Sequence, residues 1–183
     1  MRQVDVLVEL CAKKGYVSQD NVAWLRYALE KRIASLVAFI PLLILGLLIA
    51  NPATVLSFLF SFILLRTRTN GFHAKTIGRC LLYSILAELF FLKVLPLAWN
   101  NIVSFIALVL SIVLIWFLAP YGHPNMNLSS AEVTVCAKSA KCRLITLVFI
   151  LSALYIWKQK EFAIGILLGI LMTATTLVMA YCV

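Results

Sequence analysis

Charged side chains are scarce in this sequence. Only 13% of its 183 residues are Asp, Glu, Lys or Arg, whereas 63% are hydrophobic. A soluble domain of this size needs far more polar surface to cover its apolar core. The composition therefore excludes an ordinary soluble globular protein and indicates an integral membrane protein.

Acidic residues are the scarcer of the two kinds of charge. Seven Asp and Glu stand against 16 Lys and Arg, which gives a formal net charge of +9. In a membrane protein, such an excess of cations is first explained by topology and by contact with anionic lipid headgroups. We therefore expect membrane lipids, and no nucleic acid, among the partners.

Metal-binding and disulfide patterns are also lacking. The five cysteines form no CxxC pair and no regular framework, and the chain has only two histidines. A structural zinc site needs four ligands, usually at recognisable spacings. We therefore expect no metal and no other cofactor. One alternative stays open: a metal-sensing membrane protein that uses His123, Cys136 and Cys142.

Long apolar runs dominate the sequence. Six of them follow one another: Ile33–Ala50, Thr54–Leu65, Leu81–Ala98, Ile102–Ala119, Leu144–Trp157 and Phe162–Val183. A helix that crosses a bilayer needs roughly 20 residues, so Thr54–Leu65 and Leu144–Trp157 are short and either of them could be re-entrant. The sequence predicts an all-α, polytopic membrane protein in which about six transmembrane helices form one domain over residues 33–183.

The loop charges predict the sidedness of these spans. Cytoplasmic loops are enriched in Lys and Arg. The cations gather in the N-terminal arm and in the loops 66–80 and 120–143, whereas the turns 51–52 and 100–101 carry none. Both termini and the 66–80 loop are therefore predicted to be cytoplasmic.

Residues 1–32 differ from the rest of the chain because they are charged throughout. Val4, Leu7 and Val8 recur at helical spacing until Gly15 breaks the run, and a second amphipathic run follows Ser18. Helices of this kind lie in the membrane interface. The sequence predicts an amphipathic, interfacial N-terminal helical arm over residues 1–32, which anchors the first span; a specific docking role stays open.

The polar stretch NGFHAKTIGRC, residues 70–80, holds a histidine and a cysteine seven residues apart. A cysteine near a histidine serves either metal binding or nucleophilic catalysis, in which imidazole takes the thiol proton. On one straight helix, His73 and Cys80 would be about 10.5 Å apart along the axis, too far for a hydrogen bond. A catalytic pair requires a bent path, which Gly71 and Gly78 make easier. The competing interpretation is an interfacial histidine and a small helix residue.

Three other polar residues need an explanation. Glu88 and Lys93 lie within the third apolar run, where charges are costly. Glu88 is roughly 12 Å along a helix from Cys80, so it serves structural pairing or substrate contact. Glu132 belongs to the first turn of a helix, or it hydrogen-bonds His73 as the third member of a triad. His123 with Cys136 is the competing catalytic pair.

The run Arg66-Thr-Arg-Thr-Asn-Gly-Phe-His73-Ala74, followed by Cys80, resembles the signature of the AgrB family, the membrane endopeptidases of Gram-positive quorum-sensing systems. That signature is an Arg, a Gly-Gly-aromatic-His-Ala run, and a Cys seven residues after the His. Asn70 stands where the family commonly has the first Gly, and Asn tolerates left-handed backbone angles better than most residues. Ala119-Pro120, His123-Pro124 and Glu132 resemble the family's loop after the fourth span. The similarity extends over nearly the whole chain.

The resemblance implies a cysteine endopeptidase of the bacterial cell membrane that acts on an AgrD-type propeptide. Cys80 is then the nucleophile and His73 the general base and acid. The C-terminal tail of the propeptide leaves, and an internal Cys or Ser of the peptide closes a thiolactone or lactone ring. A homodimer is the arrangement that the family pattern implies.

The residues expected to contact the substrate are Arg66, Arg68, Lys75, Arg79, Glu88 and Glu132. The four cations suit the acidic tail that family substrates carry. The main alternative from another class of protein is a small peptide exporter, in which the intramembrane charges line a path and the His/Cys pair is incidental.

Overall fold

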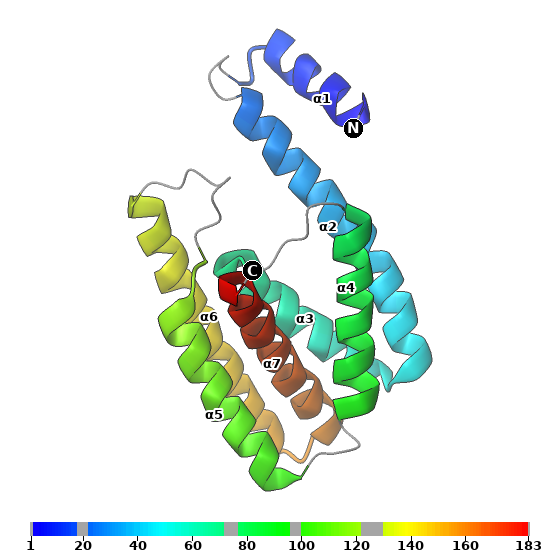
Figure 1. The fold of residues 1–183 in the computed structure, drawn as a ribbon, viewed down its shortest axis with the longest axis vertical. Coiled ribbons are helices and arrows are strands. Elements are labelled where there is room, and N and C mark those ends of the chain that lie inside the picture. The colour runs from blue at the N-terminus through cyan, green and yellow to red at the C-terminus, as the bar shows by residue number, and fades with distance from the viewer. Residues whose placement is uncertain (1, 18–21, 72–76, 96–99, 122–129, 183) are drawn as a thin grey trace. The chain divides into compact units, whose positions relative to one another are not determined.

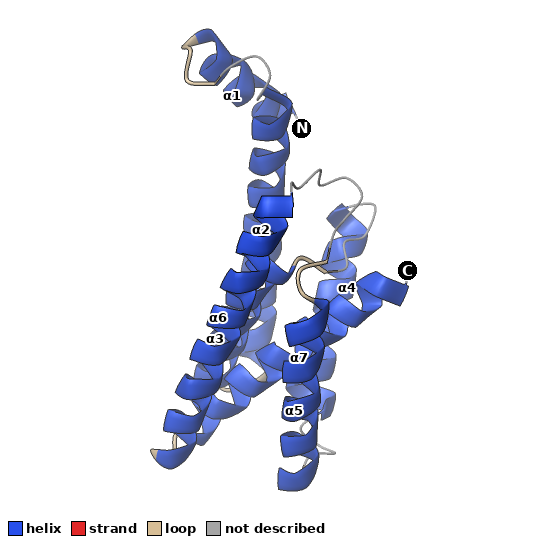
Figure 2. Ribbon diagram, turned by 90° about the vertical axis from the view of Figure 1, so that its left-hand side faces the viewer, coloured by secondary structure: helices blue, strands red, loops and turns tan. Residues whose placement is uncertain are grey.

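A computed structural model describes residues 2–17, 22–71, 77–95, 100–121 and 130–182. Throughout these ranges the regular structure is helical and no strand occurs, which confirms the all-α prediction (Figure 2). The chain divides into two compact units, Met1–Leu42 and Leu43–Val183. Each unit is described by itself.

The first unit holds helix α1 (Arg2–Lys13) and the part of α2 (Val22–Ile49) that ends at Leu42. Val4 and Val8, one turn apart on α1, are buried, whereas Leu7 and Leu10 are exposed. The carboxylate of Asp5 in α1 forms an ion pair with the guanidinium of Arg26 in α2, at 2.9 Å. The predicted arm is therefore helical. Its place in the membrane interface stays a prediction.

The second unit is a helical bundle (Figure 1). Its elements after α2 are α3 (Pro52–Thr69), α4 (Ile77–Leu89), the π-helical turn η2 (Phe90–Val94), α5 (Asn101–Leu118), α6 (Ser130–Ile156) and α7 (Lys160–Cys182). Helices α3, α5 and α6 pack around α7, and Leu65, Ile115, Leu144 and Ile170 meet in the core.

Small residues join α3 to α7. A Cβ added to Gly165 would clash with the Ser57 hydroxyl, and one added to Gly169 would clash with the Ser61 hydroxyl. Small residues four apart on both helices let the backbones approach closely, which is how membrane helices commonly associate. Each serine hydroxyl donates to its own helix, Ser61 to the carbonyl of Ser57 at 2.8 Å. The two helices therefore run parallel in close contact along these four residues.

Within the ranges above, three helical stretches are long and apolar enough to cross a membrane: Asn101–Leu118, Ala131–Ile156 and Lys160–Cys182. They include the predicted fourth, fifth and sixth spans except for the last residue of each. The fifth was expected to be short, but α6 extends it by more than three turns toward its N-terminus, because the polar residues 130–143 are helical as well. The other three predicted spans fall on α2, α3 and α4 with η2, and as membrane spans they stay predictions.

The two ends of the bundle differ in character. At one end, the side chains of Asn51 and Asn100 cap α3 and α5 by accepting from Ala53 N (2.9 Å) and Val103 N (2.8 Å). Near the same end, the Thr54 hydroxyl donates to the Glu161 carboxylate at 2.8 Å. The C-terminal ends of α3, α5 and α7 meet at the opposite end. The segments that follow α3 and α5 begin there, and the predicted sidedness of these segments stays a prediction.

Candidate functional site

The last turn of α3 positions Arg66 over Gly71. A Cβ on Gly71 would clash with the guanidinium of Arg66 and would lie 3.2 Å from the carbonyl oxygen of Thr176 on α7. The φ angle of Gly71 is +95°, a conformation that side chains other than glycine rarely adopt. Position 71 therefore requires glycine for two independent reasons, space and backbone geometry. The Nη1 atom of Arg66 is buried.

Asn70, at the C-cap of α3, connects this end of the helix to the segment after α5. Its φ is 59°, so the expected tolerance of asparagine for a positive angle is used here. The side-chain Nδ2 donates to the carbonyl of Tyr121 at 3.1 Å, and the Tyr121 N–H donates to the carbonyl of Thr69 at 3.0 Å. Two hydrogen bonds thus cross between segments about 50 residues apart, directly before the stretch that holds His73.

Tyr181, near the end of α7, completes this arrangement. Its hydroxyl donates to the carbonyl of Leu118 at 2.8 Å, and its ring meets the Tyr121 ring edge to face with centroids 5.0 Å apart. We call Asn70, Tyr121 and Tyr181 the loop clamp. The loop clamp holds the ends of α3, α5 and α7 together.

Cys80 lies in the first turn of α4, where it is a partly exposed free thiol. The backbone N–H groups of a first helical turn have no partner within the helix, which makes this end electropositive. Burial lowers the pKa of Arg66 to about 10, and the negative charge of a Cys80 thiolate acts in the opposite direction. Arg66 therefore stays charged at neutral pH and lies within electrostatic range of Cys80.

Arg143 of α6 is a site residue that the sequence did not single out. It donates to the carbonyl of Leu64 at 2.7 Å and to the hydroxyl of Thr67 at 2.6 Å, so it neutralises the carbonyl end of α3. Arg68, partly buried, lies within electrostatic range of Arg143. Only the cationic character of the 120–143 loop pointed to this contact in the sequence.

The predicted site residues are thus brought together in part. Arg66 lies within electrostatic range of Cys80, and Arg79 is exposed on the first turn of α4. His73 and Lys75 lie outside the described residues, as does His123 of the competing pair. The hydrogen bond between His73 and Cys80 stays a prediction.

The two acidic residues lie in different surroundings. Glu88 is fully buried in α4, where its Oε1 would be 2.9 Å from a Cβ on Gly46 of α2. Neither of its carboxyl oxygens has a hydrogen-bond partner among the residues that the structure describes. Glu132 is exposed in the first turn of α6, as the helix-start interpretation predicts. A role for Glu132 beside His73 is not tested.

Comparison with known proteins adds one finding. The family model Accessory gene regulator B (AgrB) matches residues 5–177, nearly the whole chain. The match includes Arg66, Gly71 and Cys80, whereas Tyr181 of the loop clamp lies beyond it. No curated protein and no solved structure matches the chain significantly.

Proposed function

Because the chain belongs to the AgrB family of autoinducer-peptide processing membrane proteins, we propose that it is a cysteine endopeptidase that cleaves an AgrD-type propeptide and promotes its cyclisation. The observation that carries this proposal is the position of Arg66, which is packed on Gly71 within electrostatic range of a thiol at a helix N-terminus. A cation and a helix N-terminus both stabilise a thiolate, the form of cysteine that attacks carbonyls.

The reaction proceeds in two acyl-transfer steps. His73 takes the proton of the Cys80 thiol, and the sulfur attacks the scissile carbonyl of the propeptide. The C–N bond breaks, His73 protonates the departing amine, and the C-terminal tail leaves. The remaining peptide is joined to Cys80 as a thioester. An internal Cys or Ser of the peptide then attacks that thioester, which closes the thiolactone or lactone ring and restores the Cys80 thiol.

The boundary of the membrane suits this sequence of steps. Exchange of one thioester for another is close to thermoneutral, so the acyl group passes to an internal thiol without a large loss of free energy. Attack by water would instead hydrolyse the intermediate. A thioester on Cys80 at the membrane boundary would meet less water than one in bulk solvent.

The cations have two roles: one acts on the thiol, and the others bind the substrate. Arg66, with its Nη1 buried, acts on Cys80 and on the loop that follows α3. Arg79 is exposed beside Cys80, and with Arg68 and Lys75 it binds the acidic tail of the propeptide. The loop clamp fixes the chain directly before the segment that holds His73. The enzyme acts as a homodimer in the bacterial cell membrane, with its catalytic loop on the cytoplasmic side.

The deciding experiment is cleavage of an AgrD-type propeptide by the purified chain in lipid vesicles. Cys80→Ala and His73→Ala should each abolish cleavage, and the wild type should form a covalent peptide adduct on Cys80. Cys142→Ala is the matched control, because Cys142 is an exposed free thiol of α6, and it should cleave like the wild type.

Full cleavage by Cys80→Ala would refute the mechanism and direct attention to His123 and Cys136. Transport of the peptide across the vesicle membrane by Cys80→Ala, with no cleavage in the wild type either, would instead support an exporter.

A further inference from the structure

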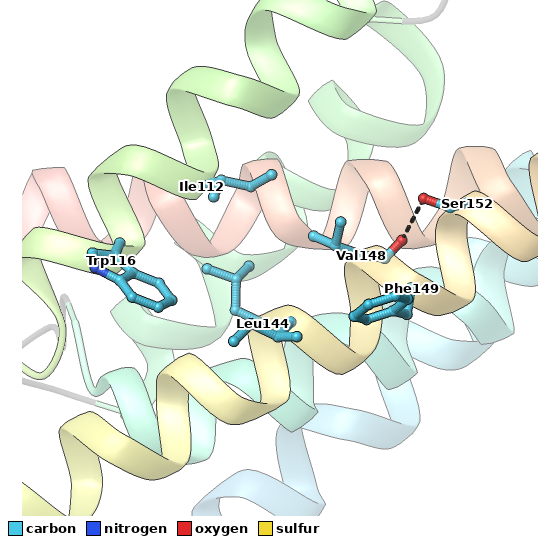
Figure 3. A pocket seen from close by; sticks show the side chains of 7 residues that line it. Ile112, Trp116, Leu144, Val148, Phe149 and Ser152 are labelled. Atoms are coloured by element: carbon cyan, nitrogen blue, oxygen red, sulfur yellow. Dashed lines mark hydrogen bonds between the residues drawn. The ribbon is translucent and has the colours of Figure 1, made fainter.

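A groove of about 210 Å³ lies between α5 and α6, and none of the residues that line it belongs to the candidate site (Figure 3). It is lined by Ile112 and Trp116 of α5 and by Leu144, Val148 and Phe149 of α6. The hydroxyl at its far end, that of Ser152, donates to the carbonyl of Val148 at 2.9 Å. The groove therefore offers a ligand almost nothing but apolar contact.

The groove belongs to the part of the protein that faces lipid. Both of its helices are long and apolar enough to span a membrane, and Phe149 in its wall is 72% exposed. Trp116 lies two residues before the end of α5, near the loop clamp. Tryptophan at the end of a membrane span is typical of the boundary between acyl chains and headgroups.

Two cations lie at this end of the groove. The ammonium of Lys141 is 4.8 Å from the centre of the Trp116 ring. Lys138 is exposed three residues earlier on the same face of α6. The third cation here, Arg143, is already bonded to α3. In α5 and α6 the only acidic residue is Glu132, two turns before Lys138.

The lining and the charges at the end of the groove together indicate the kind of ligand. A hydrocarbon chain suits the apolar lining, and Lys141 and Lys138 suit an acidic headgroup attached to that chain.

From an apolar groove that ends in two lysines, we infer a binding site for one anionic phospholipid. An acyl chain lies along Ile112, Val148 and Phe149, and the lipid phosphate lies at Lys141 and Lys138. Basic sites between transmembrane helices on the cytoplasmic side bind acidic headgroups in this way. The predicted topology puts Lys141 on that side, where it would orient the bundle next to the loop clamp.

The test uses Trp116 as the reporter. In a variant with Trp24, Trp99 and Trp157 changed to Phe, the fluorescence of Trp116 is compared in vesicles that contain dibrominated phosphatidylglycerol or dibrominated phosphatidylcholine at equal mole fraction. Each intensity is divided by that in unbrominated vesicles of the same composition. This ratio cancels any direct effect of a substitution on the fluorescence. Dibrominated phosphatidylglycerol should quench Trp116 more strongly than dibrominated phosphatidylcholine does.

Lys141→Gln should lower the preference for phosphatidylglycerol about fivefold, since one lysine near an anionic headgroup is worth about 1 kcal/mol. Lys158→Gln, at the opposite end of α6, is the matched control and should leave the preference unchanged. Ser152→Phe fills the groove and should reduce quenching by both lipids.

Equal quenching by the two lipids would overturn the inference. Quenching that rises when the protein is diluted in the bilayer would also overturn it. Such a rise would mean that a second copy of the chain covers the groove at the higher protein density. Native mass spectrometry of the unmutated chain and of Lys141→Gln, released from micelles with mixed lipids, repeats the comparison without the tryptophan substitutions. Since no propeptide is present, these results are independent of the proposed peptidase activity.

Discussion

The guanidinium of Arg66 occupies the space next to the Cα of Gly71 that a Cβ would fill. This contact joins two positions of one sequence motif five residues apart. It explains why a glycine follows the arginine at this distance. It also gives Arg66 a role inside the protein, beside Cys80.

Gly71→Ala should therefore impair both folding and cleavage. The new methyl group would displace Arg66, and φ of +95° strains any residue with a Cβ, at a cost of about 1–3 kcal/mol. Thermal unfolding in detergent and propeptide cleavage in vesicles measure the two effects.

Gly78→Ala is the matched control, because a Cβ at Gly78 would meet no heavy atom within 4 Å. Gly78 lies in the first turn of α4, where alanine favours the helix over glycine by roughly 0.5–1 kcal/mol. This variant should be as stable as the wild type or slightly more stable. Equal behaviour of the two alanine variants would show that Gly71 does not need its backbone freedom.

Arg66→Gln should slow the alkylation of Cys80 by iodoacetamide at neutral pH. A positive charge near a thiolate favours the form of cysteine that is alkylated, so the rate should fall severalfold. Peptide mapping by mass spectrometry follows Cys80 separately from the other four thiols. Arg68→Gln is the control, and its effect should be much smaller. An unchanged rate in Arg66→Gln would remove Arg66 from the activation of the thiol.

Two substitutions separate what the backbone and the side chain of Asn70 contribute to stability and cleavage. Asn70→Gly keeps the positive φ but loses the hydrogen bond to Tyr121, which is worth about 1 kcal/mol. Asn70→Ala loses the hydrogen bond and also pays about 1–3 kcal/mol for the positive φ. Cleavage and thermal stability should therefore decrease in the order wild type, Gly, Ala. Alanine equal to glycine would show that the backbone angle carries no cost.

Tyr181→Phe should loosen the loop clamp without disturbing its packing. The variant loses the hydrogen bond to Leu118 but keeps the ring against Tyr121. A loss of about 1 kcal/mol in unfolding free energy is expected. In the proposed function the clamp fixes the chain directly before His73, so kcat for propeptide cleavage should fall more than KM rises. Tyr155→Phe, on an exposed tyrosine of α6, is the control and should match the wild type in both measurements.

The sequence by itself determined the helical nature of the protein and its family. Apolar runs that long permit only helices in a membrane, since every backbone N–H and C=O must bond within its own segment. The motif from Arg66 to Cys80 was sufficient to indicate the family, and the family match confirmed it. The sequence predicted the start of α6 less accurately. Residues 130–143 are helical, but they are polar and carry no apolar periodicity.

The tertiary structure alone decided which distant residues support the site. Tyr181 bonds to Leu118 and Arg143 bonds to Leu64, contacts that span 63 and 79 residues. The parallel pairing of α3 and α7 through Ser57, Ser61, Gly165 and Gly169 is equally distant in sequence. Periodicity reports which face of a helix is apolar, but not which helix will cover it. That choice depends on the fit of small residues and on the pairing of carbonyl groups at helix ends, and both exist only after the helices have packed.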